Sequence, residues 1–407
     1  MAVVVTALVV FGVVAIRAVE VRSSAVASIV TRDEPQMLQA EGLYASLSDA
    51  DATAATTLLA GGLESSTRRQ RYLAALRNAS LQLAALGQRS QGAGEAARAI
   101  DDVAATLPVY SGLVETARAN NRQGFPVGAA YLRRASKLMR EQTLPAAGRL
   151  YALEARRLAD DQATATSGNG LFAVMTVIGL ALFALIWVQL FLARRTRRVF
   201  NVRLVAATVS IIVIGAWVTV GMIRAANATA RAQREGSDSV QLLSAARILA
   251  LRAQADESLA LVARGGGDTY LTDFRNVASA LEPPGGLLGA AEAAERRSGT
   301  AAPVAALTAQ WRGYRAAHER VAALQAQKRF GEAVRLAVGP RAQVPGLADA
   351  LNRGLATRIA AAQQRFEQSA HAARSAVRGL TVAIVVFLVV AAVLAVFGLK
   401  QRVDEYR

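Results

Sequence analysis

The sequence predicts an all-α integral membrane protein with four transmembrane helices and two extracytoplasmic four-helix bundles, related by an internal duplication. Four stretches are apolar and free of charge, and three of them have the roughly 20 residues that a bilayer span requires. Two long segments between them are rich in Ala, Leu, Val and Arg, with few Pro and 5% aromatic residues. This composition is typical of helices.

The four spans are expected at residues 1–16, 170–193, 204–223 and 379–399. The first stretch is short, but it has no basic region before it and no convincing cleavage site after it. We therefore interpret it as a transmembrane helix rather than a signal peptide.

An arginine-rich loop at residues 194–203 sets the orientation. It has no acidic residue, and the positive-inside rule places it in the cytoplasm; its basic residues are Arg194, Arg195, Arg197, Arg198 and Arg203. Both termini, including the tail 400–407, are then cytoplasmic, and segments 17–169 and 224–378 lie outside the cell. The predicted location is the plasma membrane, with several passes. Two interpretations of the loop remain open: attraction to anionic membrane lipids, and a docking surface for a cytoplasmic partner.

The net charge of +17 raises the question of nucleic-acid binding. Neither outer segment contains a block of like charge or a platform of aromatic and basic residues. Because the long segments are placed outside the cell, we expect no nucleic-acid partner.

Small and polar breaks divide each outer segment into helices. In residues 17–169 the breaks are "AGGLESS", "QRSQGAGE" and "NNRQGFPVG", and the first and fourth helices are expected to continue into membrane spans. In residues 224–378 the breaks are "RGGG", "EPPGGLLG" and "QAQKRFGEA". Short connections of this kind predict an antiparallel four-helix bundle in each segment.

A shared motif supports the duplication. "RYLAALRNAS" at 71–80 and "TYLTDFRNVAS" at 269–279 both contain a Tyr-Leu pair followed by Arg-Asn. Apolar residues follow at the spacing of a bundle seam; they are Tyr72, Leu76, Ala79, Leu83 and Leu86 in the first copy and Tyr270, Phe274, Val277 and Leu281 in the second. The matching seams suggest that the two bundles pack side by side as a pseudo-dimer.

Nothing in the sequence indicates an enzyme. It contains no phosphate-binding loop, no His-Glu-x-x-His pair, no nucleophile elbow and no Cys. The two histidines, His318 and His371, are expected on polar helix faces, too far apart in sequence to share a metal. We therefore expect no cofactor and no metal.

The spans contain no ionisable residue, which argues against a transported ion or substrate. Gln189 and Thr208 are the most polar side chains at depth, and a hydrogen bond between helices is the simpler account of both. Small residues such as Gly215 are expected to let these helices pack closely.

The third break of the first bundle is unusually polar. It contains Asn120, Asn121, Arg122, Gln123 and Phe125, and the topology places it at the membrane-distal tip beside "AGGLESS". Two interpretations remain open, a plain helix corner and a docking surface for an extracytoplasmic partner.

Residues 43–64 and 107–139 resemble GlnX-type membrane proteins of actinobacteria, and the four-span plan matches over nearly the whole chain. The resemblance implies two partners, an amino-acid-binding lipoprotein (GlnH) outside and a cytoplasmic Ser/Thr kinase (PknG) inside. It also implies that the signal is the availability of extracellular aspartate or glutamate.

The leading hypothesis is therefore a non-enzymatic transmembrane sensor or adaptor that needs a cytoplasmic partner, because the predicted cytoplasmic parts are too short for an output domain. A membrane scaffold for envelope assembly or secretion is an alternative. In a third hypothesis the bundle senses a small ligand directly, with Arg122 or Arg69 pairing with a carboxylate.

Overall fold

The computed structural model describes residues 2–60, 66–89, 94–123, 127–196, 202–263, 266–297, 302–339, 342–377, 381–387, 389–390 and 393. These ranges contain helices and no strands, in agreement with the predicted all-α class. The chain divides into two compact units. One comprises Met1–Arg32, Leu158–Gln233 and Glu367–Arg407, and the other comprises Asp33–Arg157 and Arg234–Phe366. We call Asp33–Arg157 the first half and Arg234–Phe366 the second half of this latter unit, the bundle unit.

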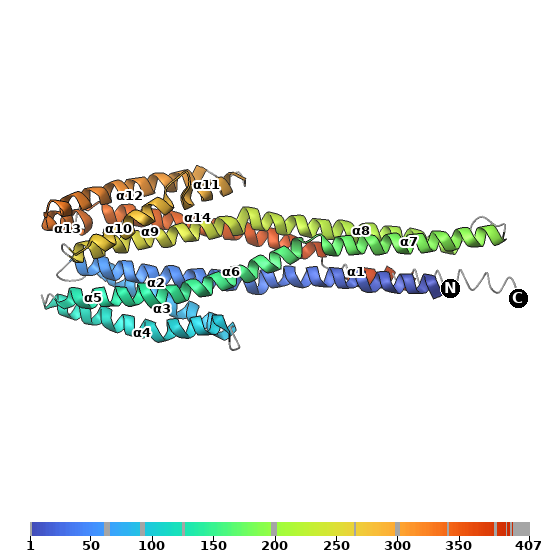
Figure 1. The fold of residues 1–407 in the computed structure, drawn as a ribbon, viewed down its shortest axis with the longest axis horizontal. Coiled ribbons are helices and arrows are strands. Elements are labelled where there is room, and N and C mark those ends of the chain that lie inside the picture. Colours follow the sequence, from blue (N-terminus) through green and yellow to red (C-terminus); the bar gives the residue numbers. More distant parts are fainter. Residues whose placement is uncertain are drawn as a thin grey trace. The chain divides into compact units, whose positions relative to one another are not determined.

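The first half of the bundle unit follows the predicted breaks. Its elements are α2 (Glu34–Ala60), α3 (Ser66–Arg89), α4 (Glu95–Arg122), α5 (Val127–Leu138), the π-helix η2 (Met139–Thr143) and the beginning of α6 (Leu144–Thr166) (Figure 1). Helix α2 packs against α3, and α4 packs against α5. Tyr72, Ala79 and Leu86 of the predicted seam are buried, and Leu76 and Leu83 pack against the same core.

In the part of the second half that the structure describes, the helices end at two more places than the sequence predicts. Its elements are the end of the π-helix η3 (Gln233–Ser237), α9 (Asp238–Val262), α10 (Asp268–Leu281), α11 (Leu287–Arg297), α12 (Ala302–Ala326), α13 (Phe330–Val338) and α14 (Val344–Val377). The additional breaks follow Arg297 and Val338. At the second, a Cβ atom on Gly339 would lie 2.4 Å from the Arg335 carbonyl oxygen. Pro345 then occupies the first turn of α14, where its missing N–H is tolerated.

The two halves share an interior. Helix α2 packs against α9, and the Thr56 and Ser258 hydroxyl oxygens lie 3.0 Å apart across this contact. Leu259 of the second half belongs to the core of the first. Arg71 on α3 donates to Asp49 on α2 and also to Asp349 on α14. The two predicted bundles thus form one compact unit.

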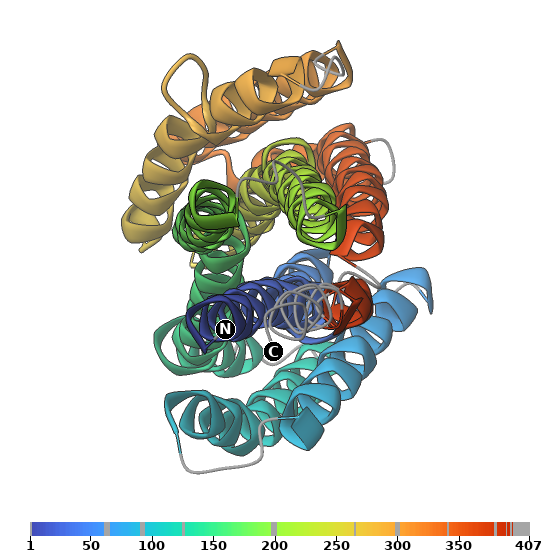
Figure 2. The same ribbon diagram turned by 90° about the vertical axis from the view of Figure 1, so that its right-hand side faces the viewer.

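The other unit contains α1 (Ala2–Ser28), α7 (Asn169–Thr196) and α8 (Val202–Ala232). In this unit α1 packs against α7, and α7 packs against α8 (Figure 2, blue and green). The Gln189 amide donates to the Thr208 hydroxyl at 2.8 Å, which confirms the predicted bond between helices. A Cβ atom on Gly215 would lie 2.9 Å from the Ile178 side chain, so the small residue does allow close packing.

Two helices among the described residues are long and apolar enough to cross a membrane. The first lies within residues Val127–Leu190, whose apolar part belongs to α7. The second is Val205–Ala232, which belongs to α8. Large side chains of these helices, including Phe172, Phe183 and Trp187, point outward and are exposed. These two helices are compatible with a membrane protein, while the four-span topology remains a prediction.

The fourth helix of the first bundle does not run on into the apolar helix that follows, contrary to expectation. Helix α6 ends at Thr166 and α7 begins at Asn169. The buried Arg22 guanidinium donates to the Ser167 carbonyl at 2.5 Å and to the Met222 carbonyl at 3.0 Å. The bond to Ser167 satisfies a carbonyl group just after the end of α6, where the helix leaves carbonyl groups without a partner.

Candidate functional site

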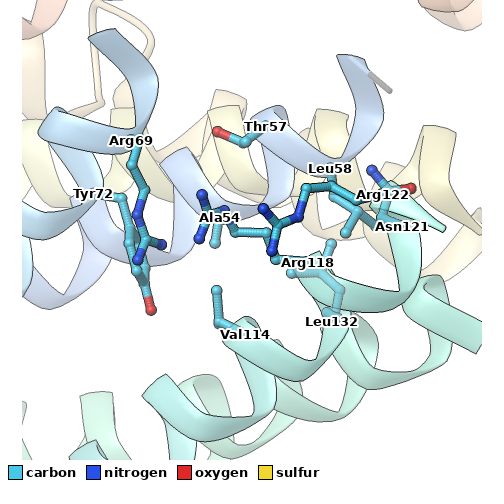
Figure 3. Close-up of a pocket in the computed structure, with 11 residues that line it drawn as sticks. Ala54, Thr57, Leu58, Arg69, Tyr72, Val114, Arg118, Asn121, Arg122 and Leu132 are labelled. Atoms are coloured by element: carbon cyan, nitrogen blue, oxygen red, sulfur yellow. The ribbon is translucent and has the colours of Figure 1, made fainter. Parts of the chain in front are cut away.

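A small cavity lies inside one end of the first half, between α2, α3, α4 and α5 (Figure 3). Its volume is about 30 Å³, which is room for one water-sized group. We call it the arginine pocket; its lining residues are Ala54, Thr57, Leu58, Arg69, Tyr72, Val114, Ala117, Arg118, Asn121, Arg122 and Leu132. None of the described residues that line the pocket is acidic.

Three guanidinium groups define the pocket's charge, and Figure 3 shows them reaching into the same space. Glu115 accepts from Arg69 at 2.5 Å and from Arg118 at 3.0 Å. Arg122 has no hydrogen bond or ion pair with any residue that the structure describes. Among the described residues, one carboxylate therefore faces three cations, and these residues give the site an excess of positive charge.

The charge of Glu115 follows from these contacts. Burial raises the pKa of its carboxyl, but the hydrogen bonds and charges of Arg69 and Arg118 outweigh burial and lower it overall. Glu115 is thus an anion at neutral pH, and it holds two of the guanidinium groups in place.

Polar atoms without partners complete the pocket. The Thr57 hydroxyl and the Tyr72 hydroxyl are buried and have no hydrogen-bond partner among the described residues. Burial raises the pKa of Tyr72, so its hydroxyl keeps its proton and remains a donor. The Arg69 guanidinium lies over the Tyr72 ring, 5.6 Å from its centroid, a distance at which a cation is attracted to an aromatic face. Buried donors without acceptors are uncommon in folded proteins and favour an acceptor from outside.

The structure brings some of the predicted tip residues to this pocket and leaves others out. Asn121 and Arg122 line it, whereas the Asn120 amide donates to the Thr116 carbonyl of its own helix at 2.8 Å. Gln123 is exposed at the end of α4. Phe125 lies outside the described residues.

The cytoplasmic-loop prediction is covered only in part. Arg194 and Arg195 lie in the last turn of α7, and Arg194 is exposed. Arg197 and Arg198 lie outside the described residues. The roles predicted for these four arginines remain predictions.

One prediction about histidine is wrong. His318 does not lie on a polar face but is buried, with its Nδ1 atom 2.8 Å from the Glu257 Oε2 atom. Its ring stacks on Phe274 with a centroid distance of 3.4 Å. A partner on another helix satisfies the imidazole, and the periodicity of a single helix does not reveal such a partner.

Sequence reasoning missed Arg118 and Tyr72 as pocket residues, and it missed a buried charge cluster around Arg140. Arg118 lies one helical turn before Arg122, so an i, i+4 pair of arginines beside the predicted tip was an available signal. For Arg140 there was no local signal, because its partner Asp256 is more than 100 positions away in the sequence.

Residues 25–163 match the family model described as the actinobacterial sensor domain. The match covers about a third of the chain and includes every residue that lines the arginine pocket. It supports placing the chain in a class, the actinobacterial sensor proteins, and it suggests a non-enzymatic role in sensing. No curated protein and no solved structure matches the chain.

Proposed function

We propose that this chain is a non-enzymatic transmembrane sensor whose first half detects a carboxylate-bearing solute at the arginine pocket. The observation that supports the proposal most strongly is the convergence of Arg69, Arg118 and Arg122 on one cavity, whose described lining residues include no acidic one. Guanidinium groups bind carboxylates through charge-assisted hydrogen bonds, often two at a time. The sensor-domain match over the same residues fits this role.

The size of the pocket defines the mode of binding. A cavity of about 30 Å³ admits one oxygen atom of a carboxylate, while the rest of the ligand stays at the exposed mouth beside Arg122. The ligand's carboxylate would supply an acceptor to Arg122, the pocket guanidinium that has no partner among the described residues. Binding then holds α3 and α4 together, because Arg69 on α3 and Arg118 and Arg122 on α4 face the same cavity.

Titration of the full-length protein in lipid nanodiscs tests the proposal, with succinate, aspartate and glutamate as probes. Arg122→Gln should raise the dissociation constant at least tenfold, since a charge-assisted bond contributes about 1.5–3 kcal/mol. Arg77→Gln is the matched control, because Arg77 is exposed on α3 and away from the pocket. Equal affinity in both variants, or no binding of any probe, would refute direct sensing at this pocket.

A second candidate is the relay that the sequence resemblance implies, from an amino-acid-binding lipoprotein outside to a Ser/Thr kinase inside. Its support in the structure is the exposure of Arg122 and Gln123 at the end of α4, beside the pocket. In this case aspartate and glutamate bind only when the lipoprotein is present. Arg122→Glu should weaken capture of the lipoprotein in a detergent pull-down, and Arg77→Glu should not. Recovery of envelope-assembly proteins alone would contradict the relay.

A further inference from the structure

A second and larger cavity lies where the two halves of the bundle unit meet. It has a volume of about 220 Å³ and lies between α2, α9 and the η2–α6 segment. We call it the interhalf cavity; its polar lining residues are Tyr44, Ser48, Asp51, Arg140 and Arg252. The volume corresponds to roughly seven waters at about 30 Å³ each, which is the size of a small amino acid.

A buried cluster with unbalanced charge adjoins this cavity. Arg140 lies between two carboxylates: its Nε atom is 3.5 Å from Asp51, and its Nη1 atom donates to Asp256. Asp51 also accepts from the Ser136 hydroxyl at 2.8 Å. The Asp51 and Asp256 side chains are 3% and 0% exposed. Two buried carboxylates thus share a single guanidinium.

The hydrogen bonds of the cluster are incomplete. Among the residues that the structure describes, Asp256 Oδ2 is buried without a hydrogen-bond partner, while the buried Tyr110 hydroxyl faces Asp51 and favours its charged form. Buried charges are normally paired and fully hydrogen-bonded, because water no longer solvates them. A cationic donor placed next to Asp51 would supply the missing charge.

Arg252 gives the same cavity a positive group. Its guanidinium is 3.4 Å from Asp273, and its side chain is half exposed, so this ion pair is weak. Tyr44 adds a hydroxyl: burial raises its pKa, although Arg252 and Arg140 oppose the rise, so the hydroxyl remains a donor. An anion alone would be repelled by Asp51, and a cation alone by Arg252.

The rest of the wall is apolar. It is formed mainly by Leu144 and Pro145 on α6 and by Ile248 and Leu251 on α9. Gly148 keeps the space open, because a Cβ atom there would already lie 3.3 Å from the Tyr44 ring. Such a wall suits the aliphatic body of a ligand.

We propose that the interhalf cavity binds a small α-amino acid with an aliphatic side chain. The ammonium group is neutralised beside Asp51, the carboxylate is received by Arg252 and the Tyr44 hydroxyl, and the side chain lies on Leu144, Ile248 and Leu251. This site is separate from the arginine pocket. Because its walls come from both halves, occupancy changes how tightly α2 and α9 pack.

Calorimetric titration of the full-length protein in nanodiscs tests this proposal with three matched probes. L-valine carries both charges, isobutylamine lacks the carboxylate, and isovalerate lacks the ammonium group. We expect valine to bind at least tenfold more tightly than either analogue. Equal binding of valine and isobutylamine would overturn the proposal in favour of a cation site, and absence of valine binding would overturn it outright.

Variants locate the binding. Asp51→Asn and Arg252→Gln should each weaken valine binding at least tenfold, whereas Arg275→Gln, at an exposed position on α10, should leave it unchanged. Because the Arg252 side chain is half exposed, we expect Arg252→Gln to fold normally. This variant therefore still tests the site if Asp51→Asn impairs folding. Arg122→Gln should not alter valine binding, which separates failure of this site from failure of the arginine pocket. Unchanged affinity in Arg252→Gln would refute the proposed carboxylate contact.

Discussion

Replacing Arg140 with Met should destabilise the bundle unit far more than replacing an ordinary surface arginine. Among the described residues, the Arg140 guanidinium is the only ion-pair partner of Asp51 and Asp256, and both carboxylates are almost fully buried. Removing one member of a buried ionic cluster typically costs about 3–5 kcal/mol, because the remaining charge has no compensation. At about 2–4 °C per kcal/mol for a domain of this size class, the melting temperature should fall by roughly 6–20 °C.

The loss should depend on pH in a defined direction. Burial raises the pKa of Asp256 to about 6, although Arg140 opposes the rise, compared with an ordinary value of 3.8. The folded state therefore binds this proton more tightly than the unfolded state, and stability falls as pH rises from about 4 to about 6. Without Arg140 the pKa rises further, so the variant loses most stability near pH 8 and least near pH 5.

Circular dichroism at the helical band measures this effect on the full-length protein in nanodiscs. Arg149→Met is the control, because Arg149 and its partner Asp102 are 58% and 56% exposed and such a pair contributes under about 1 kcal/mol. Adding Asp256→Asn to Arg140→Met should restore part of the stability at pH 8. Equal melting temperatures for the Arg140 and Arg149 variants at both pH values would refute the reasoning.

Three further predictions concern packing and one hydrogen bond between helices. Gly128→Ala should destabilise the protein by about 1–3 kcal/mol in thermal melts, because the new Cβ atom would lie 2.8 Å from a backbone oxygen of α4. The control is Gly112→Ala, which should be neutral or stabilising because the space around Gly112 is open. Trp311→Ala should cost about 3–5 kcal/mol in chemical denaturation, because the indole is fully buried, and a loss below about 1 kcal/mol would contradict that. A double-mutant cycle of Gln189→Leu and Thr208→Val should give a coupling of about 0.5–2 kcal/mol by steric trapping, and zero coupling would show that their hydrogen bond is not formed.

The helices of the first half were predictable because their signals are local. Breaks in composition place the ends of α2, α3 and α4 where the structure has them, and the seam spacing identifies Tyr72, Ala79 and Leu86 as buried. The hydrogen bond between Gln189 and Thr208 was also predictable, because few other polar groups are available along those apolar helices.

The sites were less predictable because they depend on contacts between distant segments. Arg69 and Arg122 were recognisable as carboxylate partners, but their meeting with Arg118 depends on the rotation of α3 against α4. The balance of charge at Arg140 depends on Asp256, which the other half supplies. His318 was misjudged for the same reason, because Glu257 satisfies it from α9. Periodicity shows which face of a helix is apolar, but not which polar group will meet it there.

The arrangement of α2 predicts that the two cavities influence each other. This helix contributes Thr57 and Leu58 to the arginine pocket and Ser48 and Asp51 to the interhalf cavity. A ligand that shifts α2 at one cavity therefore changes the shape of the other, and coupling between binding sites is reciprocal. Saturating succinate should change the dissociation constant of L-valine by about fivefold or more, and valine should change that of succinate by the same factor. Arg122→Gln should abolish the effect on valine without altering valine binding alone. Identical valine affinities with and without succinate, with both ligands bound, would show that α2 does not transmit a signal between the sites.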